Sequence, residues 1–171
     1  MSWIIAGLGN PGKEYVGSRH NVGRDVAAAL EEKLGKKANV ILPDVYMNAS
    51  GSALKNVSPK KLVVLHDDLD VPLGSVKISF VSGAGGHKGV ESVIKWLKTK
   101  DFIRVRIGIS PATPRGKLRR PEAKKLADFV LGKFRPPEKE KLKKVKKLVG
   151  EALELILTKG IERAQTKINS Q

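Results

Sequence analysis

The sequence predicts an α/β protein, a single domain over residues 1–171, in which helices cover both faces of a mostly parallel, mixed central sheet. Short apolar runs typical of buried strands alternate with segments whose apolar residues recur at helical spacing. Polar or glycine-rich segments follow several of the apolar runs, as is usual at the carboxyl ends of strands in open α/β sheets. The length of 171 residues and the apolar content of 40% allow a substantial core, arranged in three α/β/α layers.

The first half of the chain contains three predicted strands and two predicted helices. Residues 3–8 form a near-continuous apolar run that ends in a Gly-rich turn, and residues 21–34 place apolar side chains at helical spacing before a glycine. Residues 62–65, Leu-Val-Val-Leu, are the clearest buried strand. Between these elements we expect a short strand over residues 39–42 and a helix that ends near Asn56.

The second half alternates in the same way and then becomes helical. The expected elements, in order, are a strand over 76–80, a helix over 87–98, a strand over 103–107, a helix over 123–131 and a long helix over about 138–158. Residues 110–121, rich in Pro, Gly and basic side chains, are expected to be a loop and the most mobile segment. The chain contains no internal repeat.

The chain carries a formal net charge of +16, and most of this excess is concentrated. Residues 113–147 hold 14 Lys or Arg against 4 Asp or Glu, a net charge of +10. A solvated Lys-rich surface is the ordinary explanation. The functional explanation is a phosphate-rich partner, because a basic stripe attracts nucleic acid whatever its sequence. A membrane surface is less favoured, because the apolar stripe of the helix over 138–158 lacks an aromatic belt.

The absence of cysteine excludes disulfides, thiolate catalysis and Cys-bound zinc. The first apolar run is too short for a signal peptide. No apolar stretch approaches the ~20 residues that span a bilayer. We therefore expect a cytoplasmic protein that does not enter a membrane.

Residues 7–12, Gly-Leu-Gly-Asn-Pro-Gly, match the G-x-G-x-x-G pattern directly after the first predicted strand. A dinucleotide site would need this segment to run straight into a helix whose N–H groups meet the pyrophosphate. Pro11 removes one such N–H group, and helical spacing does not begin until Asn21. The pattern therefore favours a tight turn that presents the Asn10 side chain, whose amide can donate to an oxyanion or bind a carbonyl.

His20 lies in a polar segment at a helix entry, so it is a candidate functional residue, although a lone surface histidine is often without a function. Its candidate partner is in residues 66–70, His-Asp-Asp-Leu-Asp, because a carboxylate bonded to an imidazole fixes its tautomer and favours its charged form. One alternative is that these aspartates only cap a turn. Another is a metal site, since carboxylates and an imidazole are suitable ligands for a hard cation.

Two more polar segments have both a structural and a functional interpretation. Asn48, in Tyr46-Met47-Asn48, stands at a plausible helix cap. Residues 83–89, Gly-Ala-Gly-Gly-His-Lys-Gly, open a helix. Their backbone can approach an anion closely, or it can simply connect a strand to a helix.

Seven motifs, in order between residues 4 and 135, resemble those of the bacterial-type peptidyl-tRNA hydrolases. They are Gly7-Leu8-Gly9-Asn10-Pro11-Gly12-x-x-Tyr15, Arg19-His20-Asn21-x-Gly23, Tyr46-Met47-Asn48-x-Ser50-Gly51, His66-Asp67-Asp68-Leu69-Asp70-x-Pro72-x-Gly74, Gly85-Gly86-His87-x-Gly89, Arg104-Val105-Arg106-Ile107-Gly108-Ile109 and Asp128-Phe129-Val130-Leu131-Gly132. The resemblance implies a monomeric α/β fold that hydrolyses the ester between a peptidyl group and tRNA. It also implies binding of the tRNA acceptor arm and chemistry without a metal or an organic cofactor.

Matched residue by residue, the resemblance implies that His20 activates water as a general base and that Asp67 stabilises and orients it. It implies that Asn10 distinguishes N-blocked from free aminoacyl-tRNA. Contacts with tRNA or with the peptidyl ester are implied for Tyr15, Tyr46 and Asn48.

Two departures from the family pattern are visible. Lys88 stands where the family usually has an asparagine that contacts substrate, so we expect altered substrate positioning there, together with attraction to phosphate. Only residues 36–42 separate the first helix from the next segment, which predicts that a peripheral hairpin usual in the family is missing. Both departures leave open the alternative of an inactive, RNA-binding relative.

Overall fold

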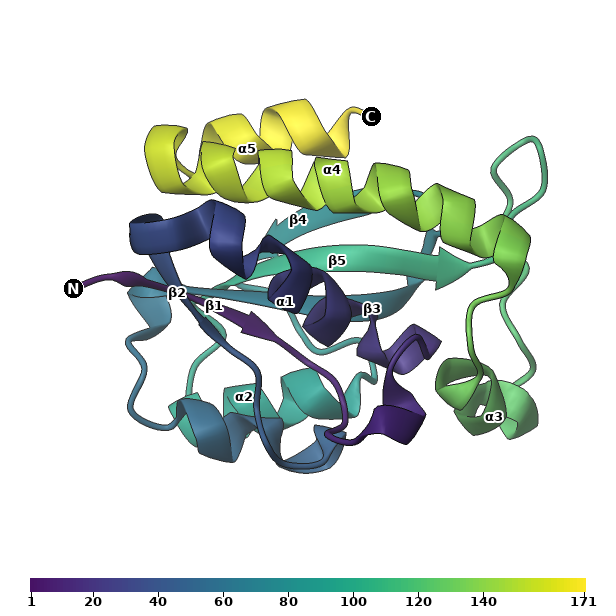
Figure 1. The fold of residues 1–171 in the computed structure, drawn as a ribbon, viewed down its shortest axis with the longest axis horizontal. Coiled ribbons are helices and arrows are strands. Elements are labelled where there is room, and N and C mark those ends of the chain that lie inside the picture. Colours follow the sequence, from purple (N-terminus) through teal and green to yellow (C-terminus); the bar gives the residue numbers. More distant parts are fainter.

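The computed structural model describes residues 1–171, and its centre is a single five-stranded sheet (Figure 1). The strand order is β2-β1-β3-β5-β4. Four strands are mutually parallel, namely β1 (Trp3–Gly7), β2 (Ala38–Ile41), β3 (Leu62–Pro72) and β5 (Ile103–Ser110). The fifth, β4 (Val76–Phe80), runs antiparallel to β5. The predicted mostly parallel, mixed sheet is confirmed.

Helices cover both faces of the sheet, which gives the predicted three layers (Figure 1). One face is covered by α1 (Val22–Leu34), α4 (Pro136–Lys159) and α5 (Ile161–Asn169). The other is covered by α2 (Lys88–Leu97) and the 3₁₀ helix η4 (Met47–Leu54). The short helix α3 (Leu126–Leu131) follows the 3₁₀ turn η6 (Ala123–Lys125) and lies near the carboxyl end of β3.

The core is divided by the sheet, and the period-2 alternation of β3 decides which side chain enters which half. Val63 and Leu65 belong to the larger cluster, under α1 and α4, whereas Leu62 and Val64 belong to the smaller cluster, under α2. All four are fully buried, and burial of each side chain contributes roughly 1.5–3 kcal/mol. The central strand is therefore held from both faces, and this holds the polar residues that follow it in place.

The most consequential difference from the sequence prediction is the length of β3. The predicted strand ended at residue 65, with residues 66–70 in a loop, but the strand continues to Pro72. Its extension pairs with β5, where Asp67 lies opposite Ile107 and Asp68 opposite Gly108. A Cβ on Gly108 would lie only 1.9 Å from the carbonyl oxygen of Pro72, so this close approach requires glycine. Pairing with β5 outweighs the polar character of the segment.

Three shorter segments agree with expectation only in part. The 3₁₀ turn η3 (Gly35–Lys37) leads directly into the edge strand β2, so no strand pair is added here, as predicted. The expected helix ending near Asn56 is instead the 3₁₀ helix η4. The helix over 123–131 begins as a 3₁₀ turn.

Helix α5 was not predicted from the sequence, because only Ala164 and Ile168 of its nine residues are buried. It folds back after Gly160 and covers the exposed edge of β4 (Figure 1). The N–H of Ile78 donates to Oδ1 of Asn169 at 2.7 Å, and Nδ2 of Asn169 donates to the carbonyl oxygen of Ile78 at 3.0 Å. The side-chain amide thus satisfies backbone groups that an edge strand would otherwise leave free.

The surface carries the predicted basic helix. The lysines of α4 that were expected on its outer face are all exposed, namely Lys139, Lys141, Lys143, Lys144, Lys146 and Lys147, and Lys159 at its end is exposed as well. None of the helices combines the length and the apolar character that a bilayer crossing requires.

We predict that Gly23→Ala lowers the free energy of unfolding by about 1–3 kcal/mol, the usual cost of overpacking. Gly23 lies in the first turn of α1, and a Cβ there would be 2.3 Å from the carbonyl oxygen of Leu65, which is backbone and cannot turn away. The matched control is Gly150→Ala in α4, where the nearest atom is 3.6 Å away and the gain in helix propensity stabilises by up to about 1 kcal/mol. Chemical denaturation measures both, and equal effects would contradict the prediction.

Candidate active site

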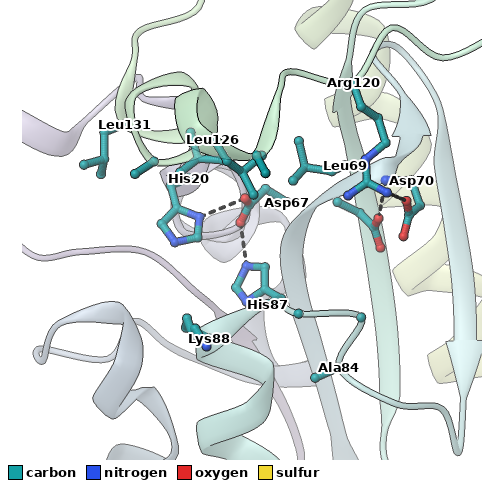
Figure 2. A pocket seen from close by; sticks show the side chains of 16 residues that line it. His20, Asp67, Leu69, Asp70, Ala84, His87, Lys88, Arg120, Leu126 and Leu131 are labelled. Atoms are coloured by element: carbon teal, nitrogen blue, oxygen red, sulfur yellow. Dashed lines mark hydrogen bonds and ion pairs between the residues drawn. The ribbon is translucent and has the colours of Figure 1, made fainter.

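A cavity of about 620 Å³ opens at the carboxyl edge of the sheet (Figure 2). Among its polar lining residues are His20, Asp67 and His87, which three different elements supply. His20 is in the 3₁₀ turn η2 (Arg19–Asn21), Asp67 is on the extension of β3, and His87 is the residue that caps the amino end of α2. Residues that are far apart in the sequence therefore meet at one point.

The apolar part of the lining comes mainly from α3. Its side chains Leu126, Val130 and Leu131 lie along the cavity (Figure 2). At the rim, Arg120 from the loop over 110–121 pairs with Asp70 at 2.7 Å, and both side chains are half exposed. The cavity can therefore accept a ligand that is polar at one end and apolar along its side.

The carboxylate of Asp67 lies between two imidazoles (Figure 2). Its Oδ2 is 2.8 Å from Nδ1 of His20, and its Oδ1 is 2.7 Å from Nε2 of His87. The side chain of Asp67 is 4% exposed and that of His20 is 16% exposed. The sequence prediction that His20 and Asp67 meet is borne out by this geometry.

Hydrogen bonds fix the tautomer of His87. Its Nδ1 accepts from the N–H groups of Gly89 and Val90, at 3.1 and 3.2 Å, and therefore carries no proton. The proton of the neutral ring is then on Nε2, from which it is donated to Asp67. Because α2 is capped in this way, Asp67 receives a hydrogen bond that does not depend on His20.

The two imidazoles hold Asp67 ionised. Burial by itself would raise the pKa of Asp67, but the nearby His87 and His20 rings and their hydrogen bonds outweigh it, and the pKa lies well below its usual range. The pKa of His20 is likewise set by burial acting against a neighbouring group. Burial would lower the pKa of His20, but the charge and the hydrogen bond of Asp67 outweigh it, so the pKa is raised above its ordinary value of 6.5.

A third imidazole, His66, lies behind His87, with ring centroids 4.9 Å apart. Its Nδ1 donates to the carbonyl oxygen of Asp67 at 2.7 Å, and its Nε2 accepts from Arg104 at 3.3 Å. Burial, together with His87 and Arg104, lowers the pKa of His66 to about 3, so the ring is neutral. Arg104 also donates to the carbonyl oxygen of Gly83 at 2.8 Å and to Oγ of Ser82, and so anchors the Gly-rich segment that leads to His87.

Asn10 is held by its neighbours so that one polar atom stays free. Its backbone N–H donates to Oδ1 of Asn21 at 2.8 Å, and Nδ2 of Asn21 donates back to its carbonyl oxygen at 2.9 Å. The N–H of Met47 donates to Oδ1 of Asn10 at 2.7 Å. The remaining atom of this amide is Nδ2, a hydrogen-bond donor that has no partner in the chain.

Residues 7–12 do not form a dinucleotide site. They lead into a short 3₁₀ turn, η1 (Lys13–Tyr15), and the first α-helix begins only at Val22. The helix that would present its N–H groups to a pyrophosphate is absent. The preference for a turn over a dinucleotide site is therefore confirmed.

The other sequence-predicted residues lie outside the hydrogen-bonded cluster. The rings of Tyr15 and Tyr46 meet edge to face at 6.3 Å, and Tyr46 is 60% exposed. Asn48 is exposed and is not a helix cap, because η4 is preceded by Tyr46 and has no side-chain cap. Lys88 lines the cavity, and its exposed ammonium group is 3.5 Å from Glu91.

The aspartates of residues 66–70 do not gather around one point, which disfavours the metal alternative. Asp68 pairs with Arg106 at 2.7 Å and Asp70 with Arg120, so each carboxylate has its own cation. Three ligand atoms of His20, Asp67 and His87 do lie within 4.8 Å of one another. A metal at Nε2 of His87, however, would force the ring proton onto Nδ1, against two backbone N–H donors.

Sequence reasoning missed the roles of His87 and Arg104. The only local signal for His87 is a histidine at the point where a Gly-rich segment becomes a helix. Arg104 alternates with apolar residues in a strand, a pattern typical of a side chain that faces solvent, yet it is 5% exposed. Neither contact can be inferred without knowing how the strands and helices are placed.

Comparisons with known proteins agree with this architecture. A family model described as "Peptidyl-tRNA hydrolase" matches residues 4–40 and 32–171, and the two matches overlap over residues 32–40. Proteins named peptidyl-tRNA hydrolase from Fervidobacterium nodosum and Syntrophotalea carbinolica are 38% and 34% identical, over 98% of this chain and 96% and 97% of their own. The crystal structure of the Acinetobacter baumannii peptidyl-tRNA hydrolase has a TM-score of 0.84 at 26% identity, covering 98% of this chain and 94% of that one. A more distant structure, the endopeptidase HycI from Escherichia coli, shares the fold at a TM-score of 0.54 and 14% identity.

We predict that the pKa of His20, measured by an NMR titration of its ring, is above 6.5 in the native chain and below 6.5 in Asp67→Asn. The variant removes the charge that raises the pKa and leaves the burial that lowers it. His66 serves as an internal reference, since its pKa of about 3 leaves it neutral between pH 5 and 9. A His20 pKa that Asp67→Asn does not lower would contradict the assignment of Asp67 as its partner.

Proposed function

The chain belongs to the peptidyl-tRNA hydrolase family, and we propose from its site that it hydrolyses the ester bond between a peptidyl, or N-blocked aminoacyl, group and tRNA. Such a reaction recycles tRNA from aborted translation. The observation that carries the proposal is the 2.8 Å contact between His20 and Asp67 in a cavity that a substrate can enter. An activated ester needs a positioned water, a base and donors for the developing oxyanion, and the site offers the last two.

In this mechanism His20 is the general base. Its Nδ1–H donates to Asp67, so Nε2 carries a lone pair that faces the cavity and can take a proton from water. The resulting hydroxide attacks the ester carbonyl, and the imidazolium then returns the proton to the ribose oxygen that leaves. Asp67 stays ionised throughout and stabilises the positive charge that His20 carries between these two steps.

Asn10 is the proposed donor to a carbonyl oxygen of the substrate. Its free Nδ2 lies on an amide whose oxygen is fixed by Met47, so the donor has one orientation before substrate arrives. A blocked amino group brings an amide carbonyl, whereas a free amino group brings a positive charge that can only repel this donor. The geometry supports the role in discrimination that the family resemblance implied for Asn10.

Tyr15, Tyr46 and Asn48 are proposed contacts for tRNA or the peptidyl ester. Tyr46 and Asn48 are exposed, and both belong to the segment that Met47 joins to Asn10. Lys88, exposed at the cavity, is proposed to attract a substrate phosphate in place of the family asparagine's amide contact. The chemistry as proposed needs no metal and no organic cofactor.

The tRNA acceptor arm is the proposed partner, bound by the chain as a monomer in the cytoplasm and as one domain over residues 1–171. Seven lysines on α4 are exposed, and among them only Lys143 is in an ion pair, with Glu140. The positive charge of this helix is therefore available to phosphates.

We predict that His20→Ala slows release of an N-acetyl-aminoacyl group from tRNA by at least about 100-fold, the lower range for loss of a general base, while tRNA binding persists. A matched control is Asn56→Ala, an exposed residue at the opposite edge of the sheet. Near-normal turnover in His20→Ala would sink the assignment. A native chain that binds tRNA without hydrolysing it would support the RNA-binding alternative, and activity lost to EDTA and restored by a divalent cation would support the metal alternative.

We predict that neutralising four lysines of α4 weakens tRNA binding and lowers the slope of log affinity against log salt by about 1–3, since each phosphate contact contributes ~0.7–0.9. The variant replaces Lys143, Lys144, Lys146 and Lys147 by Gln. The control makes the same change of charge at four exposed lysines on other elements, Lys55, Lys60, Lys95 and Lys100. A minimal ester substrate should be hydrolysed almost normally by both, and equal losses on both substrates would indicate a folding defect instead.

A further inference from the structure

We propose that Arg19 is a positioning residue, which holds His20 against Asp67 through a buried connection to Glu138 at the start of α4. The proposal rests on the proposed function only in that it gives His20 a catalytic role. The position of the His20 ring can be measured without activity.

Both the side chain and the backbone of Arg19 bond to the junction of α3 and α4. Its Nη2 donates to Oε1 of Glu138 at 3.0 Å, and the two side chains are only 10% and 9% exposed. Its Nη1 donates to the carbonyl oxygen of Phe129 at 3.2 Å, and its guanidinium lies 4.3 Å from the centre of that ring. Its backbone N–H donates to the carbonyl oxygen of Gly132 at 3.0 Å.

The anchor that receives Arg19 is itself fixed. Oε1 of Glu138 also accepts the N–H of Arg135 at 2.8 Å, which closes the first turn of α4. A carboxylate in this turn is further stabilised by the helix dipole. A Cβ on Gly132 would lie 2.8 Å from Nη1 of Arg19, so a larger residue there would displace the guanidinium group.

His20 lies between two residues, Arg19 and Asn21, whose side chains are hydrogen-bonded to other parts of the chain. Arg19 is tied to α3 and α4, and Asn21 is tied to Asn10, within one 3₁₀ turn. The backbone of His20 is thereby held on both sides while its ring reaches Asp67 at 2.8 Å. A displacement of about 1 Å breaks such a hydrogen bond and can cost a reaction about 100-fold in rate.

Stability alone does not explain the arrangement. Nε of Arg19 is buried without a hydrogen-bond partner, which is unfavourable, and a buried ion pair is often no more stable than apolar residues of similar size. The pair supplies a defined geometry, because the planar guanidinium bonds in two directions at once.

The test compares Arg19→Met with the double variant Arg19→Met/Glu138→Gln, in which no buried charge is left unpaired and Arg135 keeps its acceptor. We expect Arg19→Met to lower kcat by about 10- to 100-fold with little change in KM. The pKa of the His20 ring should fall, since the ring loses Asp67. The double variant should regain much of the lost melting temperature and still show the low kcat and the lowered His20 pKa. Arg19→Lys should rescue only in part, because an ammonium group cannot reproduce both bonds and the stacking.

Two outcomes would overturn the proposal. The first is an unchanged kcat and His20 pKa in Arg19→Met. The second is recovery of kcat together with melting temperature in the double variant, which would show that only an unpaired charge was harmful. Lys37→Met is the control for loss of an ion pair, because Lys37 and Glu154 pair at 2.9 Å on the surface with both side chains more than half exposed. A native chain without hydrolase activity would defeat the proposed function, while the His20 pKa would still report on positioning.

Discussion

The pair of hydrogen bonds to Asp67 is the interaction on which the rest of the site depends. A buried carboxylate without partners costs several kcal/mol, so the two imidazoles are required by the fold as well as by the chemistry. They can reach Asp67 only because β3 continues past its apolar run and because Gly23 lets α1 approach the end of that strand closely. Three features together place hydrogen-bond donors around the charge of Asp67 at the end of the strand. They are the extension of β3, the close contact at Gly23 and the capping of α2 by His87.

The charges of the chain act over two separate ranges. At the cavity, carboxylates are matched one by one, Asp68 with Arg106 and Asp70 with Arg120, so the local field at His20 is set mainly by Asp67. The lysines of α4 are exposed, and at physiological salt their influence falls off over about 8 Å. They are suited to attracting a polyanion and poorly suited to tuning an imidazole. Affinity for tRNA and the basicity of His20 are for this reason separable properties.

Much of the fold could be predicted from the sequence, because the apolar run of residues 62–65, the alternation of residues 103–107 and the helical spacing of residues 21–34 report burial directly. That a carboxylate of residues 66–70 would meet His20 was expected because both segments follow predicted strands, whereas the choice of Asp67 came only from the family resemblance. The features that could not be predicted depend on contacts with distant parts of the chain. The strand character of residues 66–72 comes from β5, and α5 owes its position to hydrogen bonds between Asn169 and the edge of β4. Neither contact leaves a periodic pattern in the chain.

Counting the polar atoms that remain free distinguishes the group that acts from the groups that hold it. Both ring nitrogens of His66 are hydrogen-bonded, one to the backbone of Asp67 and one to Arg104. Both ring nitrogens of His87 are hydrogen-bonded as well, one to the side chain of Asp67 and one to the N–H groups at the start of α2. His20 has one nitrogen bonded to Asp67 and one that is not. Asn10 is arranged in the same way, with its oxygen fixed and its nitrogen free. The His87 ring lies 5.1 Å from the His20 ring and 4.9 Å from the His66 ring, centre to centre. Of these three imidazoles only His20 can exchange a proton with water without first breaking a bond that supports the fold, and this, more than proximity, identifies it as the base.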